Sequence, residues 1–249
     1  MDVEYFLTER TKFIRTFYDA AVDPFVERKR LIEDEEPPFV PAYSEDPEPA
    51  YLVEWIEADA AIELIGRTCV SMLSDSLKLY FSEWERQLGI TCQVQHKTTF
   101  KKFGFLRGFR ACFQNYTKID WENGPFDFDV IEQIVLARND AQHPTEITNM
   151  SVGHRGVFKN GRRSLFFAHE SELDLLPEEG SLGWSFMNPK IHVSRKSLLK
   201  AISHVENLGN YILDLATSQA DTGFRQEARH EYQYHRPHVP RRSQGARAS

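Results

Sequence analysis

Apolar residues recur every three or four positions along most of the chain, and this period predicts amphipathic helices. In the first such segment, residues 3–30, the expected buried face carries three phenylalanines and an alanine: Phe6, Phe13, Phe17 and Ala21. The pair Asp23–Pro24 predicts a cap and a helix restart within this segment. Further helices are expected at 51–88, within 96–118, at 131–143 and at 195–217.

The longest helical pattern spans residues 51–88. Its stripe consists of eight residues three or four positions apart: Ile62, Gly66, Cys69, Leu73, Leu77, Tyr80, Trp84 and Leu88. Gly66 would allow a close helix crossing, and Gly89 is typical of the position after a helix end. Such a helix would be about 57 Å long, more than one domain of this size needs. We therefore expect a break or a partner, for example a dimer interface.

Residues 33–50, between the first two helices, predict an extended acidic loop. They contain seven carboxylates and five prolines but no Lys or Arg. Two interpretations remain open. The loop is either a solvated connector, or a mimic of nucleic-acid phosphate that covers a basic cleft or a partner.

Residues 149–190 change in character and predict a small β insertion. Two apolar runs, 155–158 and 164–167, flank an Asn160–Gly161 turn, which is a hairpin signal. Residues 190–193 can add a third short strand. The basic residues at the hairpin tip either touch RNA or are simply solvated: Lys159, Arg162 and Arg163.

The last helix, 195–217, has Ser194 as its expected N-cap. Its apolar stripe consists of Leu198, Ile202, Val205, Leu208, Ile212 and Leu215. From residue 219 the pattern stops, and residues 219–249 hold six arginines against three carboxylates. They predict a disordered basic tail that can attract RNA weakly.

The composition narrows the class of protein. With 249 residues, 41% of them hydrophobic, the chain can bury one core. It has no membrane-spanning apolar run and no signal peptide, so we expect a soluble cytoplasmic protein without a membrane partner. The net charge of −7 argues against nonspecific coating of nucleic acid, but it allows a nuclease with a local basic cleft. Three separated cysteines fit small buried thiols in a reducing compartment and argue against zinc: Cys69, Cys92 and Cys112.

Positive charge gathers in residues 96–118, where cations alternate with aromatic side chains and no carboxylate precedes Asp120. Phe109 and Phe113, four apart, are expected in the core. The cations form either a phosphate track or a solvated helix face. Those assigned to substrate binding are Lys101, Lys102, Arg107 and Arg110, while Lys97 and Lys118 complete the stretch.

Residues 131–144 carry the most informative pattern, I-E-Q-I-V-L-A-R-N-D-A-Q-H-P. Ile131, Ile134 and Val135 recur at helical spacing, which predicts a helix with this face turned to a core. Continuing this face reaches Arg138, whose guanidinium is rarely buried without a partner. Pro144 disfavours helix at His143 and so places the imidazole at the helix end. Asp129 with Glu132 fits helix N-capping better than a metal site.

At these residues the chain resembles the HEPN superfamily. Its members are all-helical, and its ribonucleases carry an Arg, four to six residues and then a His, most often with Asn after the Arg. Arg138, Asn139 and His143 match this pattern. The resemblance implies a mainly α protein, an antiparallel HEPN-like bundle. Its parts are the bundle at 1–148, a β-hairpin insertion at 149–190, a closing helix at 191–218 and the tail at 219–249.

The resemblance also implies a metal-independent endoribonuclease that needs no cofactor and leaves a 2′,3′-cyclic phosphate. His143 would act as general base or acid, Arg138 would stabilise the phosphorane-like transition state, and Asn139 would orient His143 or bind phosphate. These roles suit an imidazole, which titrates near neutrality, and a guanidinium fork, which matches phosphate oxygens. HEPN ribonucleases commonly pair two such helices across a homodimer.

The family suggests a toxin or an anti-phage defence effector, with an antitoxin or another regulatory protein as partner. HEPN toxins silenced by a nucleotidyltransferase carry a Tyr two residues after the His, where this chain has Thr145, so that mode of silencing is doubtful here.

Other interpretations stay open. Arg138 can be a structural ion pair with a carboxylate such as Asp59 or Glu63, and His143 can be a cation at a helix C-terminus. The protein would then be a non-catalytic, HEPN-like dimerising module that binds RNA or protein.

Overall fold

The computed structural model describes residues 2–43, 45, 47–116, 119–143, 151–155, 157, 165–173 and 189–234. These residues are mainly helical, as predicted, and form no β-strand. The helices are α1 Val3–Glu33, α2 Leu52–Gln87, α3 Cys92–Gln95, α4 Lys97–Tyr116, α5 Phe128–Gln142, α7 Glu170–Leu173 and α8 Arg195–Tyr234.

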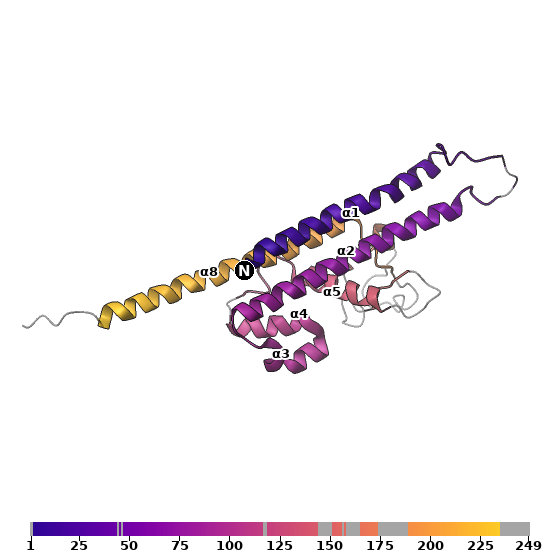
Figure 1. Ribbon diagram of the computed structural model, residues 1–249. Coiled ribbons are helices and arrows are strands. Elements are labelled where there is room, and N and C mark those ends of the chain that lie inside the picture. Colours follow the sequence, from indigo (N-terminus) through magenta and orange to yellow (C-terminus); the bar gives the residue numbers. More distant parts are fainter. Residues whose placement is uncertain are drawn as a thin grey trace, which may run out of the picture.

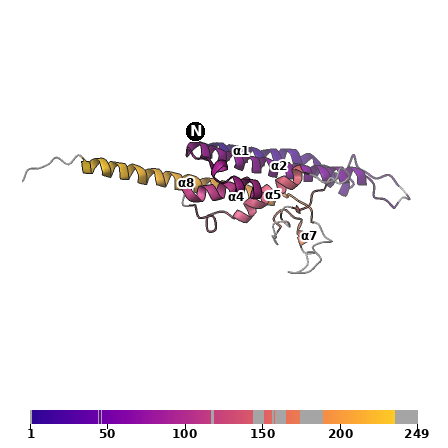
Figure 2. The same ribbon diagram turned by 90° about the horizontal axis from the view of Figure 1, so that it is seen from below.

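The long helices α1 and α2 lie side by side, and α8 packs along α1 (Figure 1). Figure 2 shows α4, α5 and α8 on one side of the α1–α2 pair. Polar contacts fix α8 on both long helices. Glu206 accepts hydrogen bonds from Thr11 (2.5 Å) and Arg15 (2.6 Å), and the Tyr80 hydroxyl donates to the Gly209 carbonyl oxygen (2.9 Å). The first and last long helices of the chain are therefore direct neighbours.

The first helix differs from its prediction in two respects. Pro24 lies inside a continuous helix, so the expected cap and restart do not occur. The buried face is also a different one, because Phe6 and Phe13 are about half exposed. The residues that α1 buries against its neighbours are Val3, Leu7, Thr11, Ile14, Tyr18 and Val22.

The helix α2 runs without the break that its length suggested. Most of its predicted stripe is buried, except Leu88, which is exposed, and Ile62, which is partly buried. Gly66 permits a close approach, but the neighbour is extended chain rather than a crossing helix. A Cβ at Gly66 would lie 2.8 Å from the Val193 Cβ and 2.9 Å from the Val193 carbonyl oxygen. The segment 191–193 therefore rests directly on α2.

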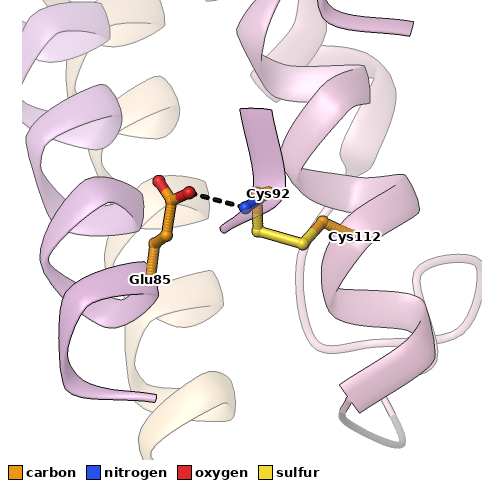
Figure 3. Close-up of a disulfide and its surroundings, with 3 residues drawn as sticks. All are labelled: Glu85, Cys92 and Cys112. Carbon is orange, nitrogen blue, oxygen red and sulfur yellow. Dashed lines mark hydrogen bonds between the residues drawn. A yellow bond between two sulfur atoms is a disulfide. The ribbon is translucent and has the colours of Figure 1, made fainter. Parts of the chain in front are cut away.

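A disulfide joins Cys92 in α3 to Cys112 in α4 (Figure 3). The expectation of three unpaired thiols was therefore wrong for this pair and correct for Cys69, which is free and buried. The Cys92 backbone N–H donates to Glu85 at 2.6 Å, which ties the start of α3 to the end of α2. The helix α4 is kinked at Gly104, whose φ of 82° suits glycine. Beyond the kink, Phe109 and Phe113 lie in the core as predicted.

The described part of the predicted β insertion is not a hairpin. Arg155 and Val157 have helical backbone where the first strand was expected, and the turn at 159–164 lies outside the described residues. Residues 190–193 are extended. Ile191 N–H donates to the Val152 carbonyl oxygen (2.7 Å), and His192 N–H donates to that of Phe167 (2.9 Å). One bridge, Gly153 to Lys190, accompanies them.

The last helix, α8, begins as predicted, because the Ser197 N–H donates to the Ser194 hydroxyl at 3.1 Å. It ends at Tyr234, so the tail predicted from residue 219 is helical at its start. Residues 235–249 lie outside the description. Among the described residues no helix is long and apolar enough to cross a membrane.

Candidate functional site

The helix α5 carries the predicted catalytic residues, and both of its ends are fixed by other elements. Its N-cap is Asp127 rather than the predicted Asp129, since Asp127 accepts from the N–H groups of Asp129 (2.8 Å) and Val130 (3.4 Å). The Asp127 N–H donates to His204 of α8 at 3.0 Å. The apolar face predicted from Ile131 and Ile134 is buried. The residues that follow on α5 are thus held on a rigid support.

Arg138 lies at the edge of this buried face with 28% of its side chain exposed. Its Nη2 lies 3.4 Å from the carboxylate of Asp75 on α2, and its Nη1 lies 3.3 Å from the side-chain oxygen of Asn139. The Nε–H is buried and has no hydrogen-bond partner among the described residues. Both contacts are long, so the guanidinium retains donor capacity for another anion.

His143 follows the last residue of α5 as its C-cap and is exposed. Pro144 lies outside the described residues. Arg155 fixes this helix end, because it donates to the backbone oxygens of His143 (2.5 Å) and Asp140 (3.3 Å). It also lies 3.7 Å from the Asp140 carboxylate. The C-terminal carbonyl groups of α5 thus have a cationic cap from a separate segment.

The carboxylates named as alternative partners of Arg138 are engaged elsewhere. Asp59 pairs with Lys29 at 2.6 Å, and Glu63 contacts His192 and Arg67. The structural ion pair of Arg138 is therefore made with Asp75, whose side chain is half exposed. Asp75 partly neutralises the charge of Arg138 but leaves part of the guanidinium side chain exposed to solvent.

The predicted phosphate-binding residues of α4 separate into two groups. Lys101 and Lys102 are exposed. Arg107 pairs with Glu132 of α5 at 2.5 Å, and Arg110 pairs with Glu122. Lys118 lies outside the described residues. Only the lysines, therefore, face solvent without a carboxylate partner in the described structure.

Both arginines line a cavity of about 870 Å³ between α4 and α5. Its walls also carry Asp127, Asp129 and Glu132, so its charge is mixed. A phosphate that entered this cavity would have to compete with these carboxylates. The cavity is thus poorly suited to the phosphate track that the sequence suggested.

The acidic loop contacts its own end of the α1–α2 pair. Arg30 binds Asp34 and Glu36 at 2.9 Å each, and the Trp55 indole N–H donates to Glu33 at 2.8 Å. Figure 1 shows the loop at the end of the bundle opposite α4. This placement favours a connector over a cover for the α4 cations.

Two histidines that sequence patterns did not single out face each other beside α2. The ring centroids of His169 and His192 are 4.9 Å apart, and His192 Nδ1 contacts Glu63. Sequence spacing could not predict this cluster, because its residues come from a short turn, an extended segment and a long helix. Only the fold brings them together.

Comparisons with protein-family models, curated proteins and solved structures found no match for this chain. The resemblance to HEPN proteins therefore rests on the sequence, and chiefly on residues 131–144. In the described part of the chain, no three His, Cys, Asp or Glu side chains are grouped so that they could hold a metal ion.

Proposed function

We propose that this protein is a metal-independent endoribonuclease of HEPN type that uses Arg138, Asn139 and His143. One observation carries the proposal. A partly exposed guanidinium, whose buried Nε–H has no partner among the described residues, lies on a fixed helix that ends at an exposed imidazole five residues later. These are the two groups that RNA cleavage without a metal requires.

In the proposed reaction the ribose 2′-oxygen attacks phosphorus, and the bond from phosphorus to the 5′-oxygen breaks. A general base takes the 2′-hydroxyl proton, and a general acid gives a proton to the leaving 5′-oxygen. His143 is one of these groups. Arg138 binds the phosphate oxygens as their charge grows. Asn139, whose side-chain oxygen lies 3.3 Å from the guanidinium, orients His143 or binds phosphate.

The second proton-transfer group would come from His143 of a second copy. The surface beside Arg138 suits such a contact. On α2, Leu64 and Leu79 are about half exposed and lie at helical spacing from Asp75, the partner of Arg138. Contacts of these two leucines with a second copy would bring two α5 helices together across a homodimer.

Lys101 and Lys102 would contribute phosphate contacts farther along the RNA, because they are exposed and lack carboxylate partners in the described structure. Arg107 and Arg110 would contribute only after leaving Glu132 and Glu122. We therefore assign the electrostatic attraction of RNA to the two lysines. The two arginines instead stabilise the fold through their ion pairs.

The alternative function is a non-catalytic, HEPN-like dimerising module that binds RNA or protein. It is favoured by the pairing of Arg138 with Asp75, which gives this arginine a structural use. In either case a toxin or anti-phage role, and an antitoxin or regulatory partner, remain proposals that follow from the HEPN resemblance.

The decisive experiment incubates the purified protein with tRNA and structured RNA in EDTA. The wild type should produce 2′,3′-cyclic phosphate ends, and His143→Ala and Arg138→Ala should each lower the rate about 100-fold or more. Arg86→Ala is the control, since Arg86 is exposed and lies outside the site. Equal rates for the wild type and His143→Ala, or no cleavage by the wild type, would overturn the ribonuclease proposal.

A second measurement tests the homodimer. Sedimentation should show a dimer that Leu64→Glu or Leu79→Glu dissociates, with loss of cleavage, while Leu88→Glu leaves the dimer intact. Leu88 is similarly exposed but lies after the end of α2. Cleavage by a variant that is monomeric would show that one copy is sufficient.

A further inference from the structure

A pocket of about 320 Å³ lies between α2, the α7 turn and the extended segment 190–192. It is separate from the Arg138 site in its residues and combines charged groups of both signs. Its volume is at the lower end for small-molecule sites. The ionisable groups that line it are Asp59, Glu63, Arg67, His169, Glu172, Lys190 and His192.

Each carboxylate of this pocket already has a partner. Asp59 binds Lys29 at 2.6 Å, and Glu63 contacts both His192 Nδ1 and Arg67, the latter at 3.8 Å. Glu172 accepts the backbone N–H of Lys190 at 3.2 Å. Asp59 and Glu63 are therefore paired with cationic side chains, while Glu172 is held by a neutral backbone donor.

In the described part of the chain, each of the two histidines has a partner at Nδ1 and none at Nε2. His169 Nδ1 lies 3.3 Å from the Ser171 backbone N–H and 2.8 Å from the Ser171 hydroxyl. Because the backbone N–H can only donate, Nδ1 acts as an acceptor and the proton of the neutral ring is assigned to Nε2. His192 Nδ1 faces a carboxylate that can only accept, so this nitrogen carries a proton. The rings are 4.9 Å apart and inclined at 56°. When protonated, His192 presents a second Nε2–H donor beside that of His169.

The Lys190 ammonium adds a further donor, since it has no carboxylate partner among the described residues. Arg67 supplies positive charge from the α2 wall, where it is nearly buried. Ile56 and Ala60 give the same wall an apolar portion. The pocket thus offers several hydrogen-bond donors, carboxylates that already have partners within the protein, and a small apolar surface.

We propose that this pocket binds a phosphate monoester no larger than a nucleoside monophosphate. The His169 and His192 Nε2–H groups and the Lys190 ammonium donate to the phosphate oxygens, which accept charge-assisted hydrogen bonds well. The uncharged part of the ligand lies against Ile56 and Ala60. This site is independent of the proposed ribonuclease, because it shares no residue with Arg138 and His143.

Binding should depend on pH through His192. Lys29, Arg67 and Lys190 balance the three carboxylates, so protonation of His192 gives the pocket a net positive charge. The Glu63 carboxylate raises the pKa of His192, which extends this protonation toward neutrality. The charged and titratable groups around His192 are Asp59, Glu63 and Arg67 on α2, His169 and Glu172 at the α7 turn, and Lys190 on its own segment.

The test titrates adenosine 5′-monophosphate, inorganic phosphate and adenosine into the full-length protein by calorimetry at about pH 6 and about pH 8.5. Adenosine 5′-monophosphate and phosphate should bind at the lower pH and about tenfold more weakly at the higher pH, while adenosine should not bind. Tighter binding of the nucleotide than of phosphate would assign the apolar wall a role. No binding at the lower pH, or equal affinity at both, would overturn the proposal.

A matched pair of lysine variants separates the pocket from general charge. Lys190→Gln should weaken phosphate binding about tenfold, because one charge-assisted contact is lost. Lys196→Gln removes the same charge from a side chain that is 90% exposed and outside the pocket, and should bind as the wild type does. Equal weakening by both variants would show nonspecific attraction and would contradict the site. Thermal unfolding of both variants checks that the fold is retained.

Discussion

The guanidinium of Arg155 donates to the carbonyl oxygen of His143 at 2.5 Å, although the two residues belong to different segments. This contact, with those to Asp140, closes the C-terminus of α5. The position of the His143 imidazole therefore depends on a residue from the region where the sequence predicted only a hairpin strand.

Replacing Arg155 with Met should loosen the last turn of α5. We expect the free energy of unfolding to fall by about 1–2 kcal/mol, because charged hydrogen bonds to partly exposed carbonyl groups are lost. Hydrogen exchange should show faster exchange for the amides of residues 140–143. Arg86→Met is the control, since Arg86 is exposed and pairs with Glu83 in its own helix. Unchanged exchange in residues 140–143 would contradict the capping role.

The ion pair of Arg107 with Glu132 should be asymmetric. Glu132 is 7% exposed and Arg107 40%, so removing the arginine leaves a carboxylate in a poorly hydrated place. Arg107→Met should cost about 2–4 kcal/mol of unfolding free energy, and Glu132→Met should cost less. The double variant should recover part of the loss. Chemical denaturation of the four proteins measures this, and equal losses in both single variants would refute the asymmetry.

The contact of His192 with Glu63 should make stability depend on pH. Because Glu63 raises the pKa of His192 in the folded protein, protonation favours the folded state. This stabilisation is fully present below the usual histidine pKa of about 6.5 and is lost as the pH rises through the raised value. The unfolding free energy of the wild type minus that of His192→Gln should thus decrease across this window. A difference that stays constant with pH would contradict the linkage.

The disulfide between Cys92 and Cys112 closes a loop with a sequence separation of 20 residues. Reduction should lower the free energy of unfolding by about 3 kcal/mol, the value expected from the entropy of a loop of this length. The variant with alanine at both positions should match the reduced wild type and should not respond to reductant. Cys69 serves as an internal control, because burial raises its pKa to about 12 and keeps the thiol unreactive at neutral pH. A wild type that is indifferent to reductant would argue against the bond.

Apolar spacing located α2, α5 and α8 because each has one dominant buried stripe. It chose the wrong face of α1, where Leu7, Ile14 and Tyr18 form a second stripe at the same period as the phenylalanines. Packing against α2 and α8 decides which of these two faces is buried. The local sequence of α1 does not show which face those helices will cover. Local pattern therefore determined where helices form better than what they pack against.

In the candidate site, too, the sequence predicted local structure but not the residues that contact it from elsewhere in the chain. The place of His143 at a helix end followed from the proline after it. The partners Asp75 and Arg155 could not be inferred, because they lie far from α5 in the sequence. The cluster of cations that includes Arg107 resembled a phosphate track in the sequence. In the structure Arg107 pairs with Glu132, a residue of another helix. The pocket of His169 and His192 has no local signal at all.

The pairing of α1 with α8 also has a consequence during synthesis on the ribosome. Helix α1 leaves the ribosome well before α8, roughly 10 to 30 s earlier at ordinary rates of translation. During that interval Thr11 and Arg15 lack Glu206, and the face of α1 that α8 covers stays open to water. Nascent chains of this protein should therefore present that face to chaperones until the last helix emerges.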